Sequence, residues 1–274
     1  LGATSCSALF FFTPDRIEFG IIFFAIAALG FWSSLVFYNS YLPDIAYPQD
    51  RDKLSAKGFA LGYIGSVILQ ILCFVILLRP GWFGLDSSDK TIGARVSFLL
   101  VGIWWFGFAQ ITFRSLPSNT ESNKKMKKNI LVNGFHELKL VWNQVNFLPG
   151  LKRYLLSFFL FSVGVQTVML VAASFSKKEI FPKDEDEPKL ILTIILIQLV
   201  AIFGAILMSR LSKLIGNIPT LLVSVFIWVG VCISGYYVQT QEQFYLLAVV
   251  VGLVMGGTQS MSRSCLLYTS PSPR

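Results

Sequence analysis

Residues 17–41 read IEFGIIFFAIAALGFWSSLVFYNSY, a run in which Glu18 carries the only charge. An α-helix rises 1.5 Å per residue, so about 20 apolar residues are needed to cross a hydrocarbon layer of roughly 30 Å. Inside lipid a single segment satisfies its backbone hydrogen bonds only by forming a helix. This stretch is therefore predicted to be a membrane-spanning helix, and it sets the expectation for the rest of the chain.

Six further apolar blocks of comparable length follow it. The predicted spans are 17–41, 58–78, 94–113, 154–175, 190–208, 218–238 and 243–262. The chain is 54% hydrophobic and 14% charged, whereas a soluble domain carries about a quarter charged residues. We therefore predict an all-α, multi-pass integral membrane protein. Residues 2–13 are apolar but too short to span, and we expect them to be the end of a cut helix, so that the chain begins mid-protein.

Fourteen of the 23 Lys and Arg residues lie in the loops after the first, third, fifth and seventh spans. Loops that stay in the cytoplasm retain an excess of basic residues, so we place these loops there. The formal charge of +8 thus has a cause in membrane topology, and no nucleic-acid partner is expected.

The longest of these loops, 114–153, contains the basic cluster Lys124–Lys128. Apolar residues recur there at helical spacing, which predicts an amphipathic helix on the cytoplasmic face with lysines near anionic head groups. The apolar positions are Leu131, Phe135, Leu138, Val141, Trp142 and Val145.

Four runs of sequence resemble signatures of one transporter family. They are YNSYLPDIA at 38–46, SAKGFALGYIG at 55–65, GVQT at 164–167 and GGTQSMSRS at 256–264. Together they are similar to the vacuole effluxer-like (UMF) branch of the major facilitator superfamily. Lys213 departs from the superfamily pattern, because the loop between helices eight and nine usually has an acidic residue at that position. The charge contact that this motif makes during gating is therefore in doubt here.

The resemblance implies a twelve-helix, two-bundle transporter, of which this chain is expected to be a truncated part with seven complete helices and part of one. Residues 1–113 would belong to the N-terminal bundle, as the end of helix three and helices four to six. Residues 114–153 would form the cytoplasmic loop, and residues 154–264 would supply helices seven to ten of the C-terminal bundle. Residues 265–274 resemble the translation of a sequencing adapter and are expected to be a non-native tail, with a native Pro/Ser linker as the alternative.

Polar side chains within the bilayer are costly, so each is a candidate for function. The candidates for substrate binding are Asn39, Gln166, Gln259 and Trp104. Membrane amides also tie helices together at about 0.6 kcal/mol per hydrogen bond, so both interpretations stay open. A site lined by amides suits a substrate with its own hydrogen-bonding groups, and the resemblance implies efflux of amino acids or similar small metabolites.

Other residues of the four runs are candidates for gating or for helix structure. Pro43 and Asp44 predict either a helix end or a cytoplasmic gate, while glycines at helical spacing predict close helix packing. The full set is Tyr38, Pro43, Asp44, Gly58, Gly62, Tyr63, Gly65, Gly164, Gly256, Gly257 and Arg263.

These features predict a secondary transporter that works by alternating access, with a non-transporting membrane receptor or scaffold as the alternative. No catalytic residue, metal ligand or cofactor is predicted, because His136 is the only histidine and no span has a carboxylate in its central third. Any coupling carboxylate would then lie in helices outside this chain, or the protein is a facilitator. The expected partners are the lipid bilayer, a small-molecule substrate and, if transport is coupled, an ion. The expected location is the bacterial inner (cell) membrane.

Overall fold

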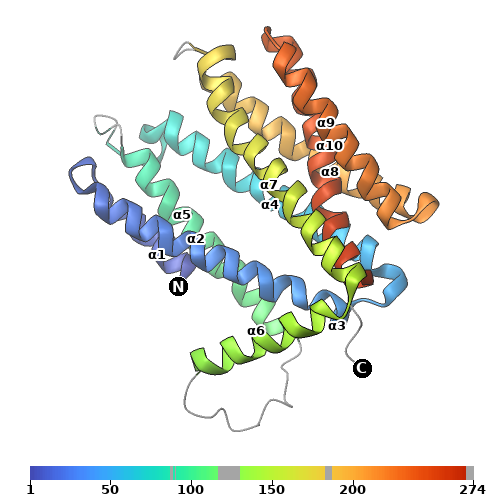
Figure 1. The fold of residues 1–274 in the computed structure, drawn as a ribbon. Helices are drawn as coiled ribbons and strands as arrows, with labels where there is room; N and C mark the ends of the chain where they lie inside the picture. The colour runs from blue at the N-terminus through green and yellow to red at the C-terminus, as the bar shows by residue number, and fades with distance from the viewer. Residues whose placement is uncertain (87–88, 90, 117–129, 183–186, 270–274) are drawn as a thin grey trace. The chain divides into compact units, whose positions relative to one another are not determined.

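The computed structural model describes residues 1–86, 89, 91–116, 130–182 and 187–269, which form helices joined by short turns (Figure 1). No strand occurs among these residues, so the predicted all-α class is confirmed. The Lys124–Lys128 cluster, most of the acidic run 184–187 and the last five residues of the predicted tail lie outside the described residues.

Seven of the described helices are long and apolar enough to cross a membrane. They are α2 (Ile17–Ser40), α4 (Arg51–Leu78), α5 (Ile92–Ser115), α7 (Pro149–Phe175), α8 (Glu187–Ile215), α9 (Asn217–Tyr237) and α10 (Gln241–Thr269). Each coincides with one predicted span, so the multi-pass prediction is confirmed. The main difference is that α4 starts at Arg51, directly after the 3-10 turn η3 (Pro48–Asp50), because the polar residues taken for a loop form its first turns.

The remaining described elements are short or amphipathic. They are α1 (Gly2–Ala8), η1 (Leu9–Phe11), η2 (Pro14–Arg16), α3 (Leu42–Ile45), η4 (Pro80–Phe83), α6 (Ile130–Asn146) and the π-helical turn η5 (Ser176–Ile180). The helix α6 has the place predicted for the amphipathic helix of the long loop.

The chain divides into two compact units. The first contains Leu1–Ile45 with Ile64–Pro117, and the second contains Ala46–Tyr63 with residues 118–274. In the first unit, α1 packs against α2 and α5, where Gly2 lies against the Trp105 ring. The start of α4 therefore belongs with the second unit. The boundaries of the two six-helix bundles stay a prediction.

In the second unit the closest helix packing joins α8 and α10. Gly252 and Gly256, four residues apart on α10, face the α8 backbone, and a Cβ at Gly252 would lie 2.7 Å from the Ile197 carbonyl oxygen. A Cβ at Gly256 would meet the carbonyl of Ala201, whose own side chain is fully buried. Small residues at this spacing let helix backbones approach closely where lipid offers no hydrophobic drive to associate.

The start of α10, in the same unit, is determined by residues close to it in the sequence. Gln243 Oε1 accepts hydrogen bonds from the backbone amides of Gln239 and Thr240, at 3.0 and 3.3 Å. The Thr240 hydroxyl in turn accepts from the Gln243 amide at 3.3 Å. This reciprocal arrangement is a capping box, which satisfies amides that a helix start leaves without partners and so fixes where α10 begins.

Candidate functional site

A buried carboxylate lies at the start of α4 and contacts the turn between α8 and α9. The Asp52 side chain is 7% exposed, and its two oxygens accept hydrogen bonds from Ser212 Oγ at 3.0 Å and Asn217 Nδ2 at 3.1 Å. Asp52 also sits in the first helical turn, where the helix dipole favours negative charge. We call these three residues the Asp52 cluster.

The geometry of the α8–α9 turn brings the two donors together. The helix α8 ends at Ile215, and α9 starts at Asn217 after a single residue, Gly216, whose φ is +89°. An L side chain disfavours that region of backbone conformation, whereas glycine adopts it readily. The Gly216 amide donates to the Ser212 carbonyl at 2.9 Å, which closes the last turn of α8. The turn at Gly216 thus places Ser212 and Asn217 where both donate to the Asp52 carboxylate.

Two more hydrogen bonds join the first half of α4 to α10. Ser55 Oγ donates to the Ser260 carbonyl at 2.9 Å, and Tyr63 OH donates to Gln259 Oε1 at 2.7 Å. Ser55 is 0% exposed and Tyr63 8%. Ser55 and Tyr63 are separated by about 12 Å along the helix, at 1.5 Å rise per residue. One predicted substrate residue, Gln259, is therefore engaged with another helix.

The three residues of the Asp52 cluster lie at helix ends that the sequence predicts to be cytoplasmic. Asp52 lies in the loop after the first predicted span, and Ser212 and Asn217 lie in the loop after the fifth; the basic-residue count assigns both loops to the cytoplasm. Lys213, which replaces the expected acidic residue, is exposed. The carboxylate that faces this turn comes from α4 instead, and its partners are the uncharged side chains of Ser212 and Asn217.

The other predicted substrate residue of the second unit lies apart from this cluster. Gln166 is near the middle of α7, and its side chain is exposed with no hydrogen-bond partner among the described residues. Its neighbour Thr167 donates to the Val163 carbonyl of the same helix at 2.8 Å. A Cβ at Gly164 would meet open space. No described contact joins Gln166 to Gln259, so their common role in one site stays a prediction.

The first unit contains the remaining substrate candidates. Asn39 is exposed near the end of α2, next to Tyr38. Trp104 on α5 is half-buried, and its ring centroid lies 4.7 Å from that of Phe108. The described residues therefore show Trp104 in an aromatic pair, and its role in a cavity stays a prediction.

The motif around Pro43 lies just beyond the end of α2. The helix α2 stops at Ser40 and is followed by the short α3, in which Pro43 is half-buried and Asp44 exposed. The Asp44 amide donates to the Tyr41 carbonyl at 3.1 Å. The interpretation as a gate stays a prediction.

The signature glycines differ in their surroundings. A Cβ at Gly257 would meet the Met208 side chain, so Gly257, like Gly256, lies at the close α8–α10 packing. No heavy atom lies within 4 Å of a Cβ placed at Gly62 or Gly65, and the close approach predicted for them stays a prediction. Gly58 and Arg263 are both half-buried.

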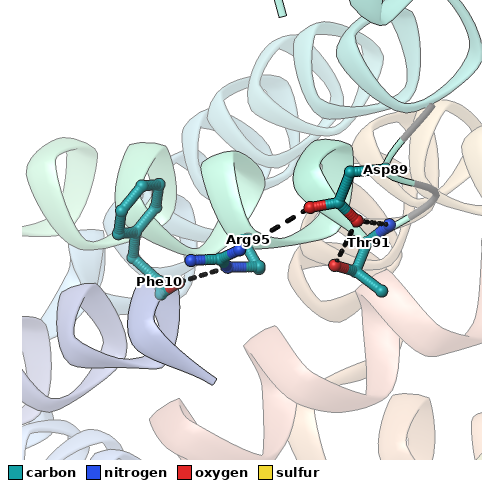
Figure 2. A network of polar contacts seen from close by, with 4 residues as sticks. All are labelled: Phe10, Asp89, Thr91 and Arg95. Atoms are coloured by element: carbon teal, nitrogen blue, oxygen red, sulfur yellow. Dashed lines mark hydrogen bonds and ion pairs between the residues drawn. The ribbon is translucent and has the colours of Figure 1, made fainter. Parts of the chain in front are cut away.

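A second polar network lies at the start of α5 in the first unit (Figure 2). Arg95 Nε donates to the Phe10 carbonyl at 2.7 Å, and an Arg95 guanidinium nitrogen lies 3.7 Å from Asp89. Asp89 Oδ1 accepts from the hydroxyl and the amide of Thr91, at 2.7 and 2.8 Å. These Thr91 bonds, with a smaller contribution from Arg95, hold the pKa of Asp89 below its usual range. The network ties α5 to η1.

Sequence reasoning missed the Asp52 cluster. Pro48 followed by Asp50 and Asp52 is a helix-start signal, and reading it would have moved the start of α4 forward. No sequence signal identifies Ser212 and Asn217 as its partners, since hydroxyl and amide side chains near a helix end are common and usually solvated.

Comparison with known proteins gives one family match. The family model described as "Vacuole effluxer Atg22 like" matches residues 1–271. The "Uncharacterized MFS-type transporter YxiO" of Bacillus subtilis is 26% identical over 96% of the chain, which covers 60% of that relative. Autophagy-related proteins 22-2 and 22-1 of Aspergillus clavatus are 26% and 28% identical, over 77% and 79% of the chain. The chain spans 37% and 39% of those two relatives. No solved structure matches the chain.

Proposed function

Because this chain belongs to the vacuole effluxer Atg22-like family, we propose that it is part of a secondary transporter that moves a small solute by alternating access. The name of the Bacillus relative, an MFS-type transporter, supports this class of function. Carriers of this type bind their substrate near mid-membrane and open to one side at a time as two helix bundles rock against each other. Such a carrier needs a gate that is stable enough to close and weak enough to open.

The contacts of the first half of α4 are the observation that carries the proposal. In the predicted bundles, α4 belongs to the N-terminal half and α8, α9 and α10 to the C-terminal half. Within the second compact unit they are joined by the Asp52 cluster, by Ser55 with Ser260 and by Tyr63 with Gln259. A few side-chain hydrogen bonds of about 1–3 kcal/mol each exchange readily for water. We infer that they form the closed cytoplasmic gate.

We assign different roles to the two signature glutamines. Gln259 lies one helical turn from Arg263, at the predicted cytoplasmic boundary, and its amide already accepts from Tyr63. Gln166 lies near the middle of α7 with an unengaged amide, which is where an alternating-access carrier holds its substrate. Gln259 is thus proposed as a gate residue and Gln166 as a substrate residue, with Asn39 and Trp104 as further substrate candidates.

The proposed substrate class, direction of transport and location rest on the family and on the chemistry of the amide side chains. An amide offers a donor and an acceptor without charge, which suits amino acids or similar small metabolites. The family description as an effluxer supports efflux as the direction. A bacterial relative that covers nearly the whole chain supports the cell membrane as the location, whereas the fungal relatives carry the name of a vacuolar family.

Transport by the complete gene product in proteoliposomes tests this proposal. Exchange of radiolabelled amino acids should be lost in Gln166→Ala while the protein still expresses and inserts. Thr167→Ala is the matched control, because its hydroxyl is satisfied within its own helix and its loss should leave transport intact. Equal transport by both variants would remove Gln166 from the substrate site. Absence of solute flux with the unmodified protein would favour a receptor or scaffold.

A further inference from the structure

The amphipathic helix α6 presents an apolar face that no described part of its own unit covers. Phe135, Leu138, Val141 and Trp142 are spaced three or four residues apart, so they lie on one side of the helix. Their exposed fractions are 74%, 65%, 53% and 67%. Large aromatic and aliphatic side chains on one continuous face signal a surface that is covered by a partner.

The opposite face of α6 is mostly polar, with Leu140 as an apolar exception. His136 and Asn143 lie on that side, about 140–160° away from Leu138 at 100° per residue, and both are exposed. Lys139 follows Leu138 and lies at the border between the two faces. A long lysine side chain at such a border reaches towards polar head groups while its methylene carbons stay against apolar surface. The helix therefore has the two-faced character of a segment at a water–lipid boundary.

The connection to α7 keeps α6 close to the membrane boundary. The helix α6 ends at Asn146, and α7, which is long and apolar enough to span, starts at Pro149. The two intervening residues bridge at most roughly 7 Å. Lys152 in the first turn of α7 donates to Asn146 Oδ1 at 3.2 Å, a contact between the two sides of the bend. Figure 1 shows the chain turning sharply between α6 and α7 instead of continuing as one helix.

The charges in this region favour an anionic partner. Between Ile130 and Arg153 there are three basic residues, Lys139, Lys152 and Arg153, against one acidic residue, Glu137. All three basic side chains are exposed. Basic residues beside an apolar helix face add electrostatic attraction to the negative lipids of the cytoplasmic leaflet.

We propose that α6 is a lipid-binding helix that lies in the interface of an anionic leaflet. Its apolar face enters the boundary between head groups and acyl chains. Lys139 of α6, with Lys152 and Arg153 at the start of α7, contacts lipid phosphates. The occupant of the apolar face is the same bilayer that α7 crosses, because the bend at Asn146 holds the two helices at one boundary. This inference does not depend on transport.

A fluorescent probe on each face of α6 tests the proposal in the complete chain. The native residues Cys6, Cys73, Cys232 and Cys265 are first replaced by serine or alanine. Leu138→Cys or its control His136→Cys is then labelled with an environment-sensitive fluorophore in nanodiscs that contain phosphatidylglycerol and brominated lipid. We expect bromine quenching to be about threefold or more stronger at position 138 than at 136, because the apolar side of an interfacial helix penetrates the acyl boundary.

The outcomes separate lipid from the other occupants. Equal quenching at the two positions would overturn the proposal. A probe at 138 that is shielded from water but not quenched by bromine would show a protein partner, and loss of quenching coupled to cross-linked dimers would show a second copy; either would also overturn it. Replacing phosphatidylglycerol by phosphatidylcholine, or Lys139 and Arg153 by glutamine, should lower the quenching at 138. No change in either case would overturn the anionic preference.

Discussion

Replacing Asp52 by alanine should open the proposed cytoplasmic gate. The substitution removes both acceptors of the cluster, and hydrogen bonds to charged groups contribute about 1.5–3 kcal/mol each. The Ser212 hydroxyl keeps an alternative acceptor, the Ser209 carbonyl at 3.0 Å, so its loss is partly offset. The Asn217 amide has no other acceptor among the described residues. The closed state should therefore lose about 2 kcal/mol, which corresponds to roughly a 30-fold shift towards the open state.

The shift is measured by access to a buried position within the proposed gate. Ser260 is 0% exposed, and Ser260→Cys keeps the backbone carbonyl that Ser55 contacts. Labelling of this cysteine by an impermeant maleimide from the cytoplasmic side should accelerate about 30-fold in Asp52→Ala. Asp50→Ala is the matched control, because its carboxylate is exposed and lies two residues away. Identical labelling rates in the two variants would refute the reasoning.

Changes at Gly256, Tyr63 and Asp89 have separate expected effects. Gly256→Ala should lower the unfolding temperature by several degrees, since its Cβ would meet α8 backbone and overpacking costs about 1–3 kcal/mol, whereas Gly164→Ala meets open space and should not. Tyr63→Phe leaves the glutamine acceptor on α10 without its donor, so gate labelling should rise about fivefold for a bond of ~1 kcal/mol. The hydrogen bonds from Thr91 lower the pKa of Asp89. Ionised Asp89 therefore stabilises the fold at pH values above the ordinary pKa of aspartate, and this stabilisation is lost as the pH falls through the lowered pKa. Acid should thus lower the unfolding temperature of the wild-type protein more than that of Asp89→Asn, and an equal fall in both would contradict it.

The membrane spans could be predicted from the sequence because lipid imposes a one-dimensional rule. Each span must be helical, long and apolar, whatever its neighbours are. The family resemblance drawn from runs such as residues 256–264 is confirmed, since the matching family model covers residues 1–271. The amphipathic helix was also predicted, because its apolar period of three and four residues is local information.

Partners across helices could not be predicted in the same way. Asp52 was assigned to a loop, because a charged residue ahead of an apolar block usually faces water, and only contact with Ser212 and Asn217 explains its burial. Gly256 belongs to a signature run, but which helix it faces depends on how α8 and α10 rotate about their axes. The residues that a side chain contacts on other helices are set by three-dimensional packing, and no local sequence pattern predicts them.

The gate is tested most directly by closing it covalently. In the complete gene product without its native cysteines, Asp52→Cys and Asn217→Cys replace two side chains that contact at 3.1 Å, and a short reducible thiol cross-linker joins them. We predict that transport in proteoliposomes stops when the link forms and returns when a reductant breaks it. Undiminished transport by fully cross-linked protein would contradict the assignment of these contacts as a gate.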